Sequence, residues 1–291
     1  MRYHGAVIRP PSEAESYILQ VTYGCSHNGC TFCGTYRDKP FRVRPEREVL
    51  EDIELARRVI PDARRAFLAD GNALVLSAER LERILDALRA AFPDLRRVGA
   101  YANAHDLLRK TVSELARLRD KGLRIVYLGL ESGSDEVLRR IQKGATAGEM
   151  IEAVERAKAA GIRVSVIALL GIGGRELASE HARETGRVVS RMDPPYLSLL
   201  TLMLVPGTRL ERQWREGTFE LPEPAALLRE LREILEHTEG LSRCLFRTNH
   251  ASNYLPLAGT LSRDQKRLLA AIDAAAAQGP TALRPEHWRA L

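Results

Sequence analysis

The chain has 291 residues, of which 45% are apolar and 28% charged, and its net charge is +6. This length and apolar content predict one large α/β domain, or a core with an appendage. No apolar run approaches the ~20 residues that span a bilayer, and the first residues resemble no secretion signal, so we expect a soluble, cytoplasmic protein with reduced thiols. The positive charge indicates anionic partners, but the arginines are scattered over predicted helices, which favours an ordinary solvated surface.

Apolar runs alternate with amphipathic segments between residues 17 and 204, after an irregular arm over 1–16. The runs predict strands at 17–22, 65–69, 97–101, 125–130, 163–170 and 196–204. The segments between them predict helices at 45–60, 77–92, 111–121, 134–142, 146–161 and 176–191, with Ser77 as an N-cap and Thr146 and Glu149 as a capping box. Strands that alternate with helices indicate a parallel sheet with right-handed crossovers.

About six such repeats favour a partial (βα)6 barrel of the TIM type, an α/β fold, over a flat sheet. Residues 216–291 differ in character, with helices predicted at 223–238 and 262–277. The second of these helices is expected to begin at a capping box formed by Ser262 and Gln265. We therefore expect a barrel core over 1–215 and a mainly helical extension over 216–291 that packs on the barrel mouth.

Three of the four cysteines stand in one loop after the first predicted strand. Cys25, Cys30 and Cys33 have the spacing C-x4-C-x2-C, which suits an iron–sulfur cluster held by thiolates. Three ligands for a four-iron cluster leave one iron open to a further ligand. A structural zinc site is the alternative, with His27 as its fourth ligand, although His27 follows Cys25 by only two residues. A disulfide is disfavoured by the odd number of cysteines in the loop and by a reducing compartment.

Polar residues and glycines follow the other predicted strands. Since the C-terminal ends of parallel strands meet at one mouth of a barrel, these residues are expected to lie together. Glycines allow a ligand close to the backbone, while amides and carboxylates suit a ribose diol or an ammonium group. The strand-end residues are Asp70, Gly71 and Asn72; Tyr101 and Asn103; Glu131, Ser132 and Gly133; and Gly171, Ile172 and Gly173.

Three stretches, taken together, indicate a known family. They are the cysteine loop with Phe32 before its last cysteine, the tripeptide Asp70-Gly71-Asn72, and residues 129–144 with the sequence GLESGSDEVLRRIQKG. Over residues 17–210 the chain resembles the radical S-adenosylmethionine (SAM) enzymes. The stretch 129–144 is similar to the branch that includes oxygen-independent coproporphyrinogen oxidase, methylthiotransferases and elongator-type acetyltransferases.

The resemblance implies a role for each matching residue. The cysteines would bind a [4Fe–4S] cluster, whose open iron would take the amino and carboxylate groups of SAM. The implied ligands and contacts are Cys25, Cys30 and Cys33 for the cluster; Phe32, Gly171, Ile172 and Gly173 for the adenine; Glu131, with Ser132 nearby, for the ribose; and Asp70, Gly71 and Asn72 for the methionine amino group, with Asn103 as a further polar partner.

The implied chemistry is cleavage of SAM by an electron from the reduced cluster, which yields a 5′-deoxyadenosyl radical that abstracts hydrogen from a substrate. An electron donor such as a flavodoxin or ferredoxin is the implied partner.

Two features depart from the family. The usual loop is C-x3-C-x2-C, and we expect Gly29 to absorb the extra residue as a turn; Asp70-Gly71-Asn72 also lacks the usual glutamate.

The expected substrate is a small or medium metabolite, acted on by an oxidoreductase, transferase or lyase. In the extension, residues 249–254 are expected to cap the barrel mouth, with His250 and Tyr254 as candidate catalytic proton or hydrogen donors; alternatively, both only satisfy backbone groups of a tight loop. Cys244 is a candidate hydrogen donor or an inert buried thiol.

Two other functions stay open: RNA modification, which the positive charge favours, and a zinc-bound scaffold or binding module.

Overall fold

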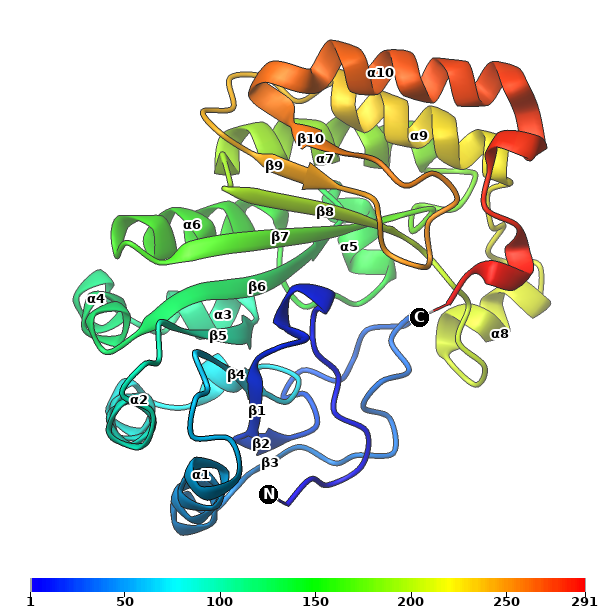
Figure 1. Cartoon of the computed structure of the whole chain (residues 1–291). Coiled ribbons are helices and arrows are strands. Elements are labelled where there is room, and N and C mark those ends of the chain that lie inside the picture. Colours follow the sequence, from blue (N-terminus) through cyan, green and yellow to red (C-terminus); the bar gives the residue numbers. More distant parts are fainter. Residues whose placement is uncertain (1, 291) are drawn as a thin grey trace. The chain divides into compact units, whose positions relative to one another are not determined.

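The structure is a computed structural model that describes residues 2–290 (Figure 1). It forms two compact units, each built from several chain segments. The first comprises Met1–Asn28, Thr35–Leu128 and Glu152–Val164, and the second comprises Gly29–Gly34, Gly129–Ile151 and Ser165–Leu291. Within residues 2–290, no helix combines the length and the apolar character needed to cross a membrane.

The first unit contains parallel strands backed by amphipathic helices. Strands β1 (Tyr17–Gln20), β4 (Arg65–Ala69), β5 (Arg97–Ala102) and β6 (Leu123–Glu131) are hydrogen-bonded in this order, and every pair is parallel. The last three residues of β6 belong to the second unit. Parallel neighbours require crossovers, which helices provide. The helices are α1 (Glu46–Val59), α2 (Ala78–Ala91), α3 (Ala104–Leu108), α4 (Val112–Asp120) and α6 (Ala147–Ala159), the last crossing into the second unit.

Helices α1, α2 and α4 follow one another along one side of these strands (Figure 1). Each turns an apolar stripe inward, because its Leu, Ile and Val residues recur at helical spacing. In α2 the stripe consists of Leu81, Ile84, Leu85 and Leu88, all fully buried. The hydroxyl of Ser77 accepts a hydrogen bond from the N–H of Arg80, which confirms the predicted N-cap.

The second unit continues the alternation of strands and helices. Strands β7 (Arg163–Leu170), β8 (Tyr196–Thr201) and β9 (Leu245–Arg247) are parallel in this order, and β10 (Ala258–Thr260) is antiparallel to β9. Helix α9 packs between α7 and α10 (Figure 1). The helices are α5 (Asp135–Arg140), α7 (Ala178–Met192), α8 (Arg209–Arg215), α9 (Pro224–Glu236) and α10 (Leu261–Gln278).

The structure confirms the α/β class with parallel strands and corrects several details. The capping box of Thr146 and Glu149 is present, since each backbone N–H donates to the other side chain. The box predicted at Ser262 is wrong, because α10 begins at Leu261 and the Gln265 amide donates instead to the carbonyl of Leu235.

Residues 216–291 contain the predicted helices and also β9 and β10, which were not predicted because three residues are too few to show alternation. The last predicted strand of the core ends at Thr201 rather than at 204. Four short 3-10 helices complete the described chain, at Pro11–Glu13, Ala73–Val75, Gly279–Ala282 and Glu286–Trp288. The division of the chain at 215/216 stays a prediction.

Candidate functional site

The cysteine loop begins after a two-stranded ribbon formed by β2 (Thr22–Tyr23) and β3 (Arg42–Val43). Cys25 belongs to the first unit, whereas Cys30 and Cys33 belong to the second. None of the three cysteines forms a disulfide, and all three are partly exposed. In the part of the chain from residue 2 to residue 290, no group of three His, Cys, Asp or Glu side chains is arranged to hold a single metal ion.

The turn after β4 holds the start of the cysteine loop through all of its residues. A Cβ atom at Gly71 would lie 2.5 Å from Cys25 Cα, so only glycine allows this approach. The Asn72 side chain accepts a hydrogen bond from the Ser26 N–H at 2.9 Å and donates one to the Ser26 hydroxyl at 2.7 Å. Asp70 accepts a bond from the N–H of Gly24 at 3.2 Å. The tripeptide thus fixes the backbone on both sides of Cys25.

Asp70 is fully buried and already has a cationic partner. Its Oδ2 lies 2.8 Å from Lys39 Nζ and accepts a further bond from Gln20 at 3.0 Å. Lys39 also donates to the carbonyl of Ala6. Burial, together with the charge of Asp70, raises the pKa of the neighbouring Tyr36 hydroxyl. These contacts favour Asp70 as a support for the loop over a free carboxylate awaiting an ammonium group.

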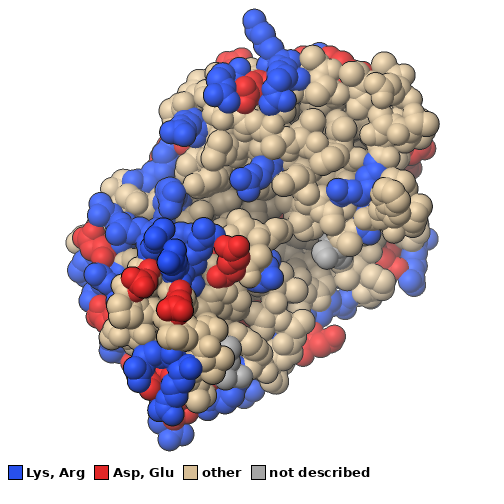
Figure 2. Space-filling model, in the orientation of Figure 1, with Lys and Arg blue, Asp and Glu red and all other residues tan. Residues whose placement is uncertain are grey.

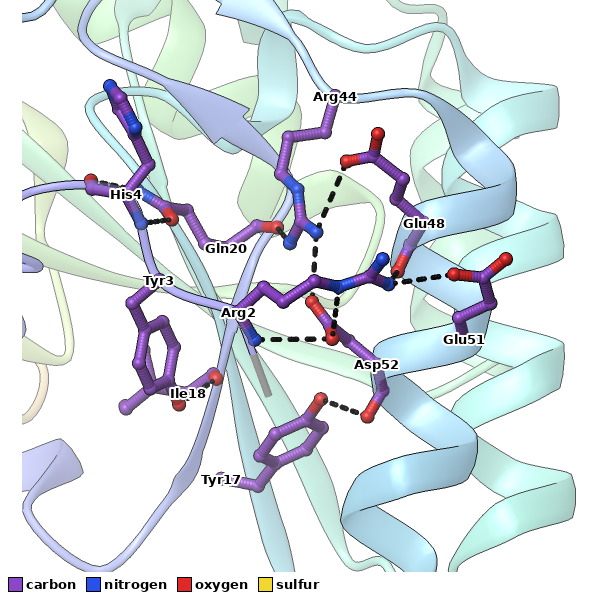
Figure 3. Close-up of polar contacts among 10 residues, drawn as sticks. All are labelled: Arg2, Tyr3, His4, Tyr17, Ile18, Gln20, Arg44, Glu48, Glu51 and Asp52. Carbon is purple, nitrogen blue, oxygen red and sulfur yellow. Dashed lines mark hydrogen bonds and ion pairs between the residues drawn. The ribbon is translucent and has the colours of Figure 1, made fainter.

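A second buried ion pair fixes the strand that leads into the loop (Figure 3). Arg44 donates to the carbonyl of Gln20 at 2.7 Å and pairs with Asp52 of α1 at 2.9 Å. On the other side of Asp52, Arg2 approaches to 3.1 Å, and His4 exchanges two hydrogen bonds with the Gln20 side chain. The first residues of the chain therefore brace β1 and, through Gln20, also Asp70.

Asp106 joins two of the predicted site residues. Its Oδ2 accepts hydrogen bonds from the Asn72 side chain at 2.8 Å and from the Asn103 N–H at 3.0 Å. Burial raises the pKa of Asp106. On β5, the half-buried Tyr101 packs edge-on against Phe67 at 5.0 Å. Sequence reasoning missed Asp106, although Asn103-x-x-Asp106 directly after a strand is a recognisable helix-entry pattern.

The other end of the cysteine loop is held by backbone groups of the second unit. The N–H of Thr31 donates to the carbonyl of Ile141 at 2.9 Å, and the carbonyl of Thr31 accepts from the N–H of Leu210 at 3.0 Å. Phe32 and Cys33 follow, both half-buried. Thr31 therefore fixes the stretch from Cys30 to Cys33 between the end of α5 and the start of α8.

The extra residue of the loop coincides with a left-handed residue. Asn28 has φ of 38°, next to Gly29, where we expected the turn. The Asn28 side chain donates to the carbonyl of Tyr36, which anchors the bend. His27 is exposed to solvent.

Glu131 ends β6 in a left-handed conformation, with φ of 62°. Its Oε1 lies 2.8 Å from Lys143 Nζ. A Cβ atom at Gly129 would lie 2.1 Å from the same Oε1, so this glycine leaves room for the pair. Lys143 was missed as a site residue, although it stands in the same stretch as Glu131, because a lysine 12 residues away gives no signal of contact.

Ser132 and Gly171, at the ends of β6 and β7, bind buried side chains of α7 and α9. The Ser132 hydroxyl lies 2.8 Å from His181 Nδ1. The N–H of Gly171 donates to Glu230 at 2.6 Å, and the same carboxylate oxygen lies 3.3 Å from His181 Nε2. Neither His181 nor Glu230 was identified from the sequence.

A cavity of about 700 Å³ adjoins the turn after β7. Gly171 and Gly174 have left-handed backbones, with φ of 85° and 63°. The cavity is bordered by Ile172, Gly173, Arg140, Leu210 and Phe219, among others. Arg140 is held there by a two-point ion pair with Glu176.

His250 and Tyr254 belong to a tightly bonded loop after β9. Nδ1 of His250 accepts from the N–H of Ser252, whose hydroxyl in turn accepts from the N–H of Thr201 at the end of β8. Burial, and to a lesser degree Arg284, lowers the pKa of His250.

The Tyr254 hydroxyl donates to Glu286 and accepts a bond from Arg289, whose guanidinium covers the ring at 4.1 Å. Burial raises its pKa to about 12. These contacts favour a supporting role for Tyr254. Cys244 is fully buried and burial raises its pKa to about 12, which favours an inert thiol.

Known proteins share both sequence and fold with this chain. The family model described as Radical SAM superfamily matches residues 19–184, which is more than half of the chain. The heme chaperone HemW of Bacillus subtilis (strain 168) is 24% identical over 221 residues, which are 72% of this chain and 56% of HemW. The chain spans about half the length of the curated relatives it matches.

Two solved structures show the same α/β fold. Coproporphyrinogen III oxidase (HemN) from Escherichia coli superposes with a TM-score of 0.58 at 17% identity, over 76% of this chain and 51% of that one. The radical S-adenosylmethionine methyltransferase TsrM from Kitasatospora setae, with cobalamin and a [4Fe–4S] cluster bound, gives a TM-score of 0.54 at 21% identity, over 71% and 41%.

Proposed function

Because this chain belongs to the radical SAM superfamily, whose members are enzymes that use a [4Fe–4S] cluster and SAM, we propose that it cleaves SAM reductively and abstracts hydrogen from a small or medium metabolite. The observation that carries this proposal is the cysteine loop. Its three cysteines form no disulfide, and the loop is anchored by Asp70-Gly71-Asn72 at one end and by Ile141 and Leu210 at the other.

The donor set fits an iron–sulfur cluster. Thiolate is the ligand that these clusters take from proteins, and each cysteine binds a different iron, so the sulfurs need not converge on one point. Partial exposure leaves the thiols accessible to incoming iron, whereas the buried Cys244 stands apart from the loop. We propose Cys25, Cys30 and Cys33 as the cluster ligands, with the fourth iron open.

The remaining residues would bind and orient SAM. We propose that Glu131, whose charge is balanced by Lys143, accepts hydrogen bonds from the ribose hydroxyls. The turn at Gly171, Ile172 and Gly173 would support the adenine through backbone groups, with Phe32 beside it, because its glycines leave the backbone open. Bound together, the cluster and SAM would supply the one-electron cleavage that gives methionine and a 5′-deoxyadenosyl radical, with the electron arriving from a flavodoxin or ferredoxin.

The size of the cavity favours a small-molecule substrate over a macromolecule. Its volume of about 700 Å³ lies within the range of small-molecule sites. His250 stays our candidate for moving a proton, since its ring is half-buried and this burial lowers its pKa.

Anaerobic reconstitution tests this function. We expect the wild-type protein to take up about four irons and, with dithionite and SAM, to release 5′-deoxyadenosine. Cys25→Ala, Cys30→Ala and Cys33→Ala should each lose the cluster, while Cys244→Ala should keep it. A single dispensable loop cysteine would contradict the assignment, and one tightly held zinc would support the scaffold alternative instead.

One observation favours RNA modification as a second candidate. A small cleft of about 90 Å³ in the first unit is lined by four arginines and one acid, namely Arg89, Arg96, Arg97, Arg124 and Asp120. Arg97 pairs with Glu13, but within residues 2–290 neither Arg96 nor Arg124 has a carboxylate partner. Figure 2 shows basic side chains gathered on the side where Figure 1 places α2, α4 and the start of β6.

Unpaired arginines around a small cleft suit a phosphate group. We expect salt-sensitive RNA binding that falls in the double variant with Arg96→Ala and Arg124→Ala, if RNA is the substrate. A wild-type protein without affinity above background at ~0.15 M salt removes this candidate.

A further inference from the structure

A buried polar network in the second unit connects two strand ends to two helices. It consists of Ser132 after β6, Gly171 after β7, His181 on α7 and Glu230 on α9. Two hydrogen bonds tie the strand ends to the helices, Ser132 Oγ to His181 Nδ1 at 2.8 Å and Gly171 N–H to Glu230 Oε1 at 2.6 Å. His181 Nε2 lies 3.3 Å from Glu230 Oε1, but the two atoms form no hydrogen bond. His181 and Ser132 are 0% exposed and Glu230 is 3% exposed.

Helix packing alone does not explain why Glu230 lies in this position. On α9 it falls between Leu227 and Ile234, on the face that is otherwise apolar and buried. A carboxylate there loses its hydration, and its Oε2 has no hydrogen-bond partner among residues 2–290. A leucine of similar size would avoid this cost. The carboxylate must therefore serve contacts that an apolar side chain cannot make.

The contacts that it makes all lead to the strand ends. Glu230 fixes the N–H of Gly171 at the left-handed start of its turn. The neighbouring His181 ring fixes Ser132, whose hydroxyl accepts in addition from the N–H of Ser134.

Helix α7 adds two further contacts to the turn after β6. The N–H of Gly133 donates to the Thr185 hydroxyl at 2.9 Å. A Cβ atom at Gly133 would lie 2.2 Å from the carbonyl of Glu184, so the turn lies directly against the helix. The turn after β6 is thus held by His181, by Thr185 and by the backbone of α7, and the turn after β7 is held by Glu230.

We propose that Glu230 and His181 are positioning residues that hold the turns after β6 and β7 in the geometry required to bind SAM, and so make cofactor binding depend on helix α9. This inference rests on the proposed function. Glu131 precedes Ser132 and Ile172 follows Gly171, so a shift of either turn displaces a residue assigned to the ribose or to the adenine.

The chain offers a matched control on the same helix. Glu233 lies three residues after Glu230, and its carboxylate binds Ser179 and faces Arg183 near the surface. It contacts neither strand end. Glu233→Ala therefore removes a carboxylate from α9 without touching the network.

Two measurements on the reconstituted full chain test the proposal: the Kd for SAM, by calorimetry under anaerobic conditions, and amide hydrogen exchange of residues 129–134 and 171–174 without SAM. Glu230→Ala and His181→Ala should bind SAM about tenfold more weakly, a difference of about 1.4 kcal/mol, with unchanged iron content. Exchange should be faster at residues 171–174 in the Glu230 variant and at residues 129–134 in the His181 variant. Glu230→Gln keeps an acceptor for the N–H of Gly171, so its Kd for SAM should lie between those of the wild type and Glu230→Ala. Glu233→Ala should match the wild type.

A purely structural role would give a different pattern. If Glu230→Ala fails to fold, the nearly isosteric Glu230→Gln and the His181 variant decide the question. Wild-type Kd and wild-type exchange in both would overturn the inference, as would a loss of iron in parallel with the loss of affinity. If the wild-type protein carries four irons and still fails to bind SAM, the proposed function and this inference are both overturned. If the wild type binds SAM and the variants bind it equally well, only the inference is overturned.

Discussion

The turn after β4 and the turns after β6 and β7 carry similar polar residues, but these residues play opposite parts. The turn after β4 supports a neighbouring loop, whereas the turns after β6 and β7 are supported by side chains of helices. After β4, Asp70 and Asn72 use their own side chains to hold Gly24 and Ser26 of the cysteine loop. After β6 and β7, the backbone and hydroxyl groups are held by side chains that come from distant helices, namely His181 and Glu230. A polar residue at a strand end can thus support a neighbouring loop or be supported itself.

The difference has a physical origin. The loop next to β4 has few apolar residues, so it depends on specific hydrogen bonds for its position. The turns after β6 and β7 lie against packed helices, and buried polar groups from those helices find their partners in the turns. The following substitutions separate the two arrangements.

The largest effect is expected at Gly71. Gly71→Ala places a Cβ atom 2.5 Å from Cys25 Cα and 2.7 Å from the Gly24 carbonyl, so the loop must move. We expect nearly complete loss of reconstituted iron, measured against protein concentration. The control is Gly148→Ala in α6, where the nearest atom lies 3.9 Å away; it should keep its iron and gain a few tenths of a kcal/mol of stability at most. A Gly71→Ala protein with normal iron content would contradict the close approach.

Removal of Lys39 should strongly destabilise the fold. Lys39→Met leaves the buried Asp70 without its cation, which should lower the free energy of unfolding by about 3–5 kcal/mol in urea denaturation. The double variant with Asp70→Asn should recover much of this loss, because no buried charge remains. Lys121→Met, which breaks an exposed pair with Asp86, should cost less than about 1 kcal/mol. If the Lys39 and Lys121 variants lose the same free energy of unfolding, the buried ion pair stabilises the fold no more than the exposed one.

A moderate effect is expected at Asn72. Asn72→Ala removes the bonds to Ser26 and leaves Asp106 with one donor fewer, at a cost of about 1–3 kcal/mol. The cluster should also be lost faster to an iron chelator, because the segment after Cys25 is freer. The exposed Asn249 provides a control, and its alanine variant should lose iron at the wild-type rate. If both variants lose iron to the chelator at the same rate, Asn72 does not support the cysteine loop.

The smallest effect concerns the pH dependence of stability. Since the folded-state pKa of His250 is lowered, the unfolded chain binds more protons just below the ordinary pKa of 6.5. Stability should therefore fall as the pH drops through and below about 6.5, and it should be fully present above that value. His250→Gln should lose less stability than the wild type between about pH 7.5 and 5.5, measured as Tm. Identical pH profiles would contradict the burial of the ring.

The sequence was most informative where chemistry and chain order coincide. Three cysteines within nine positions, and glycines or polar residues directly after apolar runs, can be recognised without knowledge of contacts. Their remote partners could not be predicted, because Lys39, His181 and Glu230 reach the site only through tertiary packing. Glu230 did leave one signal, since a carboxylate on the apolar face of α9 breaks its helical pattern.

The response of the reduced cluster to SAM tests the central claim most directly. The account predicts that the dithionite-reduced, reconstituted protein gives the electron paramagnetic resonance signal of a [4Fe–4S]⁺ cluster, and that saturating SAM changes this signal because its amino and carboxylate groups bind the open iron. A four-iron cluster whose spectrum is unaffected by SAM would contradict the account.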